Sequence, residues 1–323
     1  MQLLFLVARR AYGQPVDVRV LVEPQQGATY DDLLVVARVS EDAGFGGFFC
    51  SDHYLAIAGP GLPGPTDAWL SLAGLARETS RVRLGTLMSP VTFRLPGPLA
   101  IQVAQLDQMS QGRIELGLGA GWYEAEHSAY GIPFPGVGER FDRLEEQLAI
   151  ITGLWAAPED GTFSFTGQHY TLRDAPALPK PVQAHVPILI GGDGKRRTPE
   201  LAARYASEFN SNYDTIDDVA VRFERVLAAC EHVGRPSHEL VLSTAHFLIV
   251  GSSAAEVQRR VDAMVHIWPG PTTDLMAGSP AQVVDLLGRC AEIGVRRAYL
   301  RIIDLSDIDQ LEVIASEVVP QLD

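Results

Sequence analysis

The sequence predicts an α/β fold, namely a (β/α)8 TIM-like barrel with an insertion between strands four and five. The first observation is that short apolar runs of strand length alternate with longer stretches at helical spacing along the 323 residues. The second is that eight such strand–helix units can be placed, which implies a parallel sheet closed into a barrel. The third is the turn at 23–26, which lacks the glycine pattern of a doubly wound dinucleotide-binding sheet.

Four strand–helix units precede the insertion. Their strands are predicted at 18–22, 46–50, 82–88 and 113–117. The first helix begins at Tyr30, because Thr29 can cap its free amide groups and two aspartates follow in the first turn, where negative charge is favourable. Gly44 ends this helix. We expect Thr66 to cap the next helix, and a third helix to occupy 98–109.

Residues 118–186 interrupt the alternation and form the predicted insertion. The insertion contains a helix at 140–155, followed by the sequence FSFTGQHYTL, which is typical of a small hairpin turning at Thr166–Gly167. A proline-rich segment, ALPKPVQ, leads back to the barrel. We therefore expect a helix and a hairpin outside the eight strand–helix units.

Four further units complete the predicted barrel. Their strands are predicted at 187–190, 207–210, 240–250 and 297–303, and their helices at 199–205, 217–233, 254–264, 280–293 and 307–319. Pro199 is expected at the first position of its helix, where the missing amide hydrogen costs nothing. The segment 265–278 is expected to be a loop. The barrel domain is thus predicted to span 16–323, and residues 1–15 are interpreted as an N-terminal extension that need not be ordered.

Composition and charge restrict the function. The net charge is −14 and the pI is near 5.0, which argues against a general binder of nucleic acid or of anionic membranes. The apolar run Leu3–Ala8 is too short to span a bilayer, and charges follow it rather than precede it, unlike in a signal peptide. The three cysteines lack metal-ligand spacing and are expected to be reduced, buried thiols. We expect a cytoplasmic protein that acts on a small molecule.

The segment after the predicted fifth strand, GGDGKRRT at 191–198, suits an anionic ligand. The glycines Gly191, Gly192 and Gly194 let backbone amide groups approach a phosphate, and the following helix adds the positive end of its dipole. Lys195 and Arg197 add positive charge in an otherwise acidic chain. The alternative is a glycine turn with solvated basic side chains. The segment is not a Walker A motif, because the Gly-Lys-Ser/Thr order and spacing are absent.

Polar side chains are also predicted at the ends of other strands, where a barrel carries its chemistry. Asp52 and His53 follow the second strand, and histidine is the usual proton-transfer group near neutral pH. The alternative is that Asp52 caps a turn and His53 is a satisfied loop residue. Glu23 ends the first strand, either as a proton-transfer group or as a structural partner of a basic neighbour. Gly119 and Gly121 permit a flat ligand to approach closely, although tight packing also requires glycine.

The remaining candidates are weaker. His127, Tyr130 and His185 have no special spacing and are expected to be ordinary surface or loop residues. No His/Cys cluster has metal-ligand spacing, and no Gly-x-Ser-x-Gly nucleophile motif is present.

The motifs taken together resemble the bacterial luciferase-like superfamily, and within it the F420-dependent oxidoreductase branch. The resemblance covers roughly residues 17–320. It is carried, in this order, by Ser51–His53, Leu84–Thr86, Pro90–Arg94, Gly112–Trp122, Arg140–Phe141, Glu145–Glu146, the 163–172 hairpin, Lys180–Pro181 and Pro187–Gly192.

The resemblance implies a barrel, often homodimeric, that holds a deazaflavin or a flavin across its strand ends. It places Asp52 and His53 near the ring system. It also implies a non-proline cis peptide bond at Leu87–Met88, behind the ring.

The resemblance further implies that the glycines of 191–194 hold the cofactor phosphate, and that Lys195 or Arg197 contacts the anionic tail of F420. One departure restricts the substrate. Sugar-phosphate dehydrogenases of the superfamily carry a glutamate acid where this chain has Trp122, which argues against a sugar phosphate. Glu23 and Glu124 are the candidates to replace that acid.

The favoured hypothesis is an F420-dependent oxidoreductase that transfers a hydride between deazaflavin C5 and a small organic substrate. The catalytic candidates are His53 and Glu23, with the cofactor supplying the redox chemistry. One alternative is an FMN-dependent monooxygenase that receives reduced flavin from a partner reductase. Another is a non-catalytic flavin-binding barrel. The substrate is expected to be selected by the segments 54–65, 118–186 and 265–278.

Overall fold

Eight parallel strands close into a barrel in the computed structural model, which describes residues 15–212, 215–269 and 275–322. Around the ring the order is β1 (Asp17–Val22), β2 (Gly47–Cys50), β3 (Arg83–Thr86), β5 (Ile114–Gly119), β8 (Ile188–Gly191), β9 (Glu208–Asn212), β10 (Val241–Val250) and β12 (Arg297–Ile302). The last strand pairs with the first, from Asp17 opposite Arg297 to Val22 opposite Ile302. The predicted (β/α)8 barrel is confirmed.

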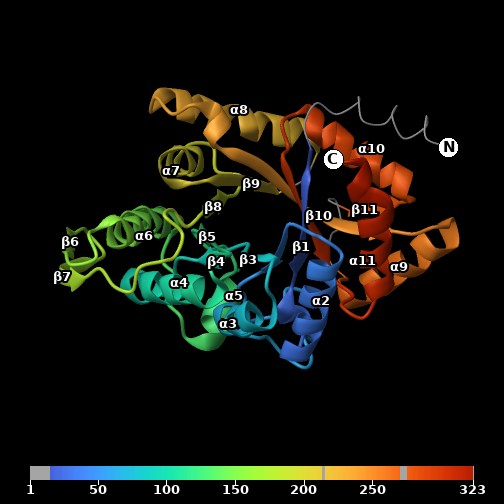
Figure 1. Cartoon of the computed structure of the whole chain (residues 1–323), viewed down its shortest axis with the longest axis horizontal. Coiled ribbons are helices and arrows are strands. Elements are labelled where there is room, and N and C mark those ends of the chain that lie inside the picture. The colour runs from blue at the N-terminus through green and yellow to red at the C-terminus, as the bar shows by residue number, and fades with distance from the viewer. Residues whose placement is uncertain (1–14, 213–214, 270–274, 323) are drawn as a thin grey trace.

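Helices surround the barrel (Figure 1), and each begins within two residues of the predicted position. They are α2 (Tyr30–Asp42), α3 (Ala68–Glu78), α4 (Pro96–Ser110), α7 (Arg197–Tyr205), α8 (Ile216–His232), α9 (Ala254–Ile267), α10 (Pro280–Glu292) and α11 (Ile308–Val313). Thr29 caps α2 in a capping box with Asp32. The expected cap of α3 is wrong, because Asp67 rather than Thr66 directly precedes the helix and accepts a hydrogen bond from the amide of Leu70 at 2.9 Å.

The predicted insertion lies between β5 and β8, and Figure 1 shows it beside α4 at the edge of the barrel. It contains α5 (Glu124–Tyr130), α6 (Val137–Ala156) and the hairpin of β6 (Thr162–Thr166) and β7 (Thr171–Pro176). Glu146 of α6 holds the hairpin turn, because its carboxylate accepts hydrogen bonds from the backbone amides of residues 168–170 at 2.6–3.2 Å. The short helix α5 was not predicted.

Other differences concern short elements. The segment 265–278 was expected to be a loop, but Leu275–Gly278 forms β11, which pairs with the end of β10. A two-residue strand, β4 (Ser89–Pro90), pairs with β5. The helix expected to begin at Pro199 begins two residues earlier, at Arg197. The final helix is shorter than predicted, because α11 gives way to a π turn at Ile314–Val318.

The two ends of the described chain meet. The amide of Val16 donates a hydrogen bond to the carbonyl of Leu322 at 3.1 Å. The expected N-terminal extension lies outside the described residues, apart from Pro15.

The barrel interior has a charged layer at the N-terminal ends of the strands and an apolar layer above it. Arg19 of β1 is 2% exposed and contacts Asp17 and Glu115, both at 2.9 Å. Arg83, Glu208 and Arg297 extend this ionic layer. The apolar layer comprises Leu21, Phe49, Leu189, Ala245 and Tyr299, with Leu87 packed on it. The two layers fill the barrel, so a ligand can bind only at its rim.

Candidate active site

The C-terminal ends of parallel strands meet at one end of a barrel, which we call the mouth. Segments that follow the strands therefore surround the mouth. They include Glu23 after β1, 51–54 after β2, 87–88 after β3, 120–122 after β5 and 192–195 after β8.

His53 is paired with Glu126 at the mouth. The Nδ1 atom of His53 lies 3.0 and 3.1 Å from the two carboxylate oxygens of Glu126, which also accepts a hydrogen bond from the amide of Tyr54 at 3.0 Å. The Glu126 side chain is 1% exposed and that of His53 is 13% exposed. Burial by itself would lower the pKa of His53, but the hydrogen bond and charge of Glu126 outweigh it and raise this pKa.

The pairing fixes the role of each imidazole nitrogen. Because Glu126 accepts from Nδ1, proton exchange with a ligand is left to Nε2 of His53. This atom has no hydrogen-bond partner among the described residues. Sequence reasoning selected His53 but missed Glu126, because α5 was not predicted and 73 positions separate the two residues.

Two aromatic side chains flank His53. The ring of Trp122 lies edge-on to the imidazole with 5.7 Å between centroids, and that of Tyr123 lies at 6.0 Å. The two aromatic rings stack on one another at 5.1 Å. The hydroxyl of Tyr123 donates to the carbonyl of Ala56 at 2.9 Å, which ties α5 to the segment after β2.

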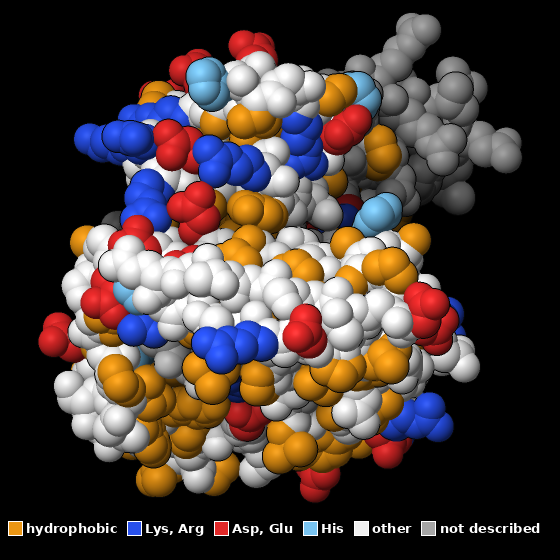
Figure 2. Space-filling model, turned by 90° about the vertical axis from the view of Figure 1, so that its left-hand side faces the viewer, with side chains coloured by type: hydrophobic (Ala, Val, Ile, Leu, Met, Phe, Trp, Pro, Cys, Tyr) orange, Lys and Arg blue, Asp and Glu red, His pale blue; other side chains and the backbone are white. Residues whose placement is uncertain are grey.

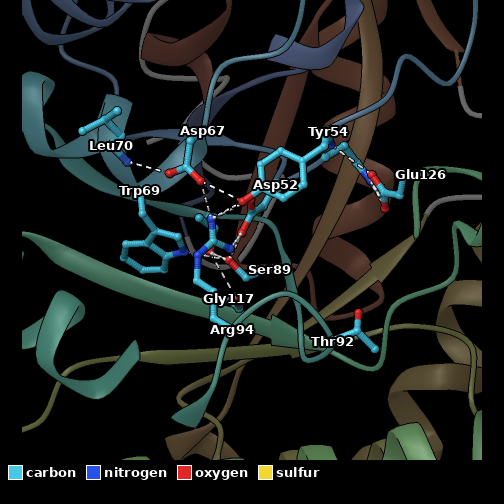
Figure 3. A network of polar contacts seen from close by, with 12 residues as sticks. Asp52, Tyr54, Asp67, Trp69, Leu70, Ser89, Thr92, Arg94, Gly117 and Glu126 are labelled. Carbon is cyan, nitrogen blue, oxygen red and sulfur yellow. Dashed lines mark hydrogen bonds and ion pairs between the residues drawn. The ribbon is translucent and has the colours of Figure 1, made fainter. Parts of the chain in front are cut away.

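Asp52 is fully buried and lies in a polar network with Ser89 and Arg94 (Figure 3). Its carboxylate pairs with the guanidinium of Arg94 and accepts from Ser89 at 2.6 Å. Arg94 also contacts Asp67 at 2.8 Å, and Asp67 accepts from the hydroxyl of Tyr54 at 2.8 Å. Burial raises the pKa of Asp52, and the Arg94 charge opposes that rise. The network ties the end of β2 to the start of α3, and the predicted contact of Asp52 with a cofactor ring stays a prediction.

Glu23 has basic and polar partners of its own. Its carboxylate lies 3.0 Å from Nε of Arg301 and accepts from the amide of Gln25 at 2.6 Å. These contacts favour a structural role, and a catalytic role for Glu23 stays a prediction.

The Leu87–Met88 peptide bond is cis, as the resemblance implies. Met88 packs against glycines of the neighbouring strands. A Cβ atom on Gly119 would lie 2.8 Å from the sulfur of Met88, and one on Gly191 would lie 2.9 Å from its terminal methyl group. These glycines therefore allow tight packing around Met88. Gly121 has a φ of +79°, which favours glycine there.

The glycine loop after β8 leads directly into α7. Gly192 has a φ of +120°, and a Cβ on Gly194 would lie 2.3 Å from the hydroxyl of Thr198. Lys195 is exposed. Arg197 is held against α6 instead, 2.7 Å from Asp142. Basic side chains gather at the height of α7 and α8 in Figure 2, so this part of an acidic protein offers positive charge.

The expectation that His127 is an ordinary surface or loop residue is wrong. It is fully buried on α5, where Nδ1 lies 2.7 Å from the carbonyl of Tyr123 and Nε2 lies 2.6 Å from the hydroxyl of Thr92. Both nitrogens are satisfied, so His127 stabilises α5 and with it the position of Glu126.

No group of three or more His, Cys, Asp or Glu side chains among the described residues could hold a metal ion. Across the same residues, no helix is long and apolar enough to cross a membrane.

Comparisons with known proteins concern the family and the fold of the chain. The model of the luciferase-like monooxygenase family matches residues 15–293. An F420-dependent glucose-6-phosphate dehydrogenase of Microbacterium testaceum is 36% identical over 181 residues, which are 55% of this chain and 52% of that protein. The pyrimidine monooxygenase RutA of Stutzerimonas stutzeri is 29% identical over 251 residues, which are 73% of this chain and 65% of that protein.

The chain thus spans between half and two thirds of the length of these curated relatives. Among solved structures, an F420-dependent secondary alcohol dehydrogenase in complex with an F420-acetone adduct superposes with a TM-score of 0.83. It shares 19% sequence identity, and the match covers 96% of this chain and 100% of that one. At 19% sequence identity, this superposition shows a shared fold and not a shared activity.

Proposed function

This chain belongs to the luciferase-like monooxygenase family, and from that premise we propose that it is an F420-dependent oxidoreductase. It transfers a hydride between deazaflavin C5 and a small organic substrate bound at the mouth. The observation that carries the proposal is the His53–Glu126 pair, which occupies Nδ1, raises the pKa of His53 and leaves Nε2 without a partner among the described residues.

The residues at the mouth fit a cofactor with a flat ring and a phosphate. The backbone of the half-buried Gly192 and the exposed Gly194, in the loop before α7, would hold the phosphate. Lys195 would contact an anionic tail. Met88, fixed between glycines, offers an apolar surface to a ring. When bound, the deazaflavin supplies the hydride chemistry, and the protein supplies orientation and charge.

His53 handles the proton in this proposal. A carbonyl substrate that becomes an alcohol gains a proton on its oxygen, and Nε2 of His53 gives it. Glu126 keeps Nδ1 protonated and stabilises the imidazolium, much as a carboxylate orients histidine in other acid–base pairs. In the reverse direction neutral His53 takes the proton from the alcohol.

Cofactor titration tests the proposal. The purified full chain is titrated separately with F420 and with FMN, by fluorescence or calorimetry. F420 is expected to bind more tightly, which is supported by the higher identity of the F420-dependent relative. Tighter binding of FMN would contradict the proposal that the protein depends on F420.

The second candidate is an FMN-dependent monooxygenase supplied with reduced flavin by a partner reductase. It is favoured by the match to a monooxygenase over 73% of this chain. Oxygen consumption with reduced FMN would support it, since flavin activates oxygen and deazaflavin does so poorly. A non-catalytic flavin-binding barrel predicts binding without turnover, and the His53–Glu126 pair argues against it.

We also propose that the protein forms a homodimer, that it acts in the cytoplasm and that it does not bind nucleic acid. Exposed apolar side chains on α4 and on the segment after β7 support the dimer, among them Ile101 at 46% and Leu178 at 48% exposure. Figure 2 shows hydrophobic side chains gathered at the lower part of the face it presents. Analytical ultracentrifugation tests the oligomeric state. We likewise propose that 16–323 form one domain.

A further inference from the structure

Trp122 presents a large aromatic surface beside His53. Its side chain is 62% exposed, yet it is held in place by stacking on Tyr123 and by its edge-on contact with His53. Tyr123 is itself anchored to Ala56. An exposed indole that is already ordered can contact a ligand at little entropic cost, and aromatic faces favour other flat rings.

The buried carboxylates near His53 are already paired. Glu126 accepts from His53, Asp52 pairs with Arg94, and Glu23 pairs with Arg301. A cationic ligand would have to displace one of these partners, which leaves a buried charge without compensation. An anionic ligand at His53 would meet the negative charges of Glu126, Glu23 and Asp52, which all act on this imidazole. A neutral polar atom can bind Nε2 of His53 without either cost.

The segment 55–58, which Tyr123 contacts at Ala56, is apolar. The segment that carries Ala56 continues with Ile57 and Ala58, which pack with Phe247 and Trp268. No residue between Tyr54 and Thr66 carries a charged side chain, so this segment offers no ion pair to a ligand.

We propose that Trp122 selects a neutral, aromatic substrate whose ring stacks on the indole and whose single carbonyl or hydroxyl oxygen binds Nε2 of His53. This inference rests on the proposed function, because it takes the substrate to bind where His53 transfers a proton. It adds the substrate class, and it excludes carboxylates and phosphates at this position.

Three ketones test the selectivity. Acetophenone is neutral and aromatic, 4-acetylbenzoate is aromatic but carries a negative charge, and butanone is neutral but has no ring. Binding to the full chain is measured by calorimetry, with and without saturating F420 or FMN. Acetophenone is expected to bind at least about fivefold more tightly than either of the others. Equal or tighter binding of 4-acetylbenzoate overturns the proposal.

Variants of the indole assign the selectivity to Trp122. Trp122→Ala is expected to weaken acetophenone at least about fivefold and to leave butanone unchanged, whereas Trp122→Phe retains most of the preference. Val35→Ala, which removes a half-exposed apolar side chain from α2, is the control and changes neither. Trp122→Leu replaces Trp122→Ala if thermal unfolding shows the alanine variant to be misfolded. Unchanged acetophenone affinity in the non-aromatic variant overturns the proposal.

The cofactor arms separate this inference from the proposed function. If neither F420 nor FMN binds but acetophenone binds in a Trp122-dependent way, the proposed function fails and the substrate class stands. If a cofactor binds and the three ketones are not distinguished, the substrate class fails and the proposed function stands.

Discussion

Nδ1 of His53 lies 3.0 Å from a carboxylate oxygen of Glu126, which reaches it from a helix of the insertion. Removing the negative charge of that carboxylate is expected to lower the pKa of His53, since Glu126 is what raises it. If protonated His53 is the acid, activity falls as pH rises through this pKa. In Glu126→Gln the fall should therefore begin at lower pH. The exposed Ser128→Ala on the same helix is the control, and coincident pH–rate profiles for all three proteins would contradict the assignment.

His53→Ala should depress turnover far more than cofactor affinity. Loss of a positioned acid–base group costs about 10²- to 10⁴-fold in rate, whereas the phosphate and ring contacts of the cofactor are proposed elsewhere. Steady-state rates and cofactor dissociation constants are measured on the same preparation. An unchanged rate would remove His53 from the catalytic residues.

Arg94→Met should destabilise the fold, because it leaves the fully buried carboxylate of Asp52 without its counter-charge. Breaking a buried pair in this way costs about 3–5 kcal/mol. Urea unfolding measures the loss. The double variant Asp52→Asn/Arg94→Met should regain part of it, since the amide carries no charge. A loss below about 1 kcal/mol in the single variant would show that the network contributes little.

Gly119→Ala should weaken cofactor binding while the fold persists. The added methyl group would lie 2.8 Å from the sulfur of Met88, so this side chain must shift at the mouth. Overpacking of this kind costs about 1–3 kcal/mol of stability. Gly138→Ala in α6 is the matched control, since nothing lies within 4 Å of its added Cβ. The control should keep cofactor affinity and gain up to about 1 kcal/mol of stability.

His246→Gln should reduce the sensitivity of the fold to acid. Burial, together with the charge of Arg301, lowers the pKa of His246 to about 3. The unfolded chain takes up a proton on this residue below about pH 6.5, while the folded chain does not until about pH 3. Stability is therefore lost as pH falls through this window, by up to about 1.4 kcal/mol per pH unit. The exposed His185→Gln should leave the slope of unfolding free energy against pH unchanged.

The strands could be predicted because each is a short apolar run bounded by turn residues, and eight such runs permit few topologies. The short elements β11 and α5 could not be predicted. The four residues of β11 include a glycine and follow a proline-rich stretch, so no strand pattern is visible at Leu275–Gly278. Helix α5 has seven residues and buries two polar ones, Glu126 and His127, so apolar periodicity gives no signal there.

The sequence indicated candidate residues at the end of each strand, but it did not indicate which of them contact one another. The end of β2 indicated His53, but the partner that orients it is determined by how the insertion folds over the mouth. Asp52 was selected for the same reason as His53, although its side chain lies behind the strand ends with Arg94. Alternation along a strand does not reveal which of two consecutive polar residues turns to the mouth once the strand has ended. Glu126 could have been found as a carboxylate on a short segment directly after the glycines of β5.

The hydrogen bond between the amide of Val16 and the carbonyl of Leu322 brings the start of the first strand to the last turn of the chain. A barrel whose ends adjoin in this way can be circularly permuted with a short linker. The exposed turn at 158–160, between α6 and β6 of the insertion, is a suitable place for new termini. A chain opened there would keep all eight barrel strands intact. The two halves of the insertion would then end at the new termini and could be shortened or extended without changing the barrel.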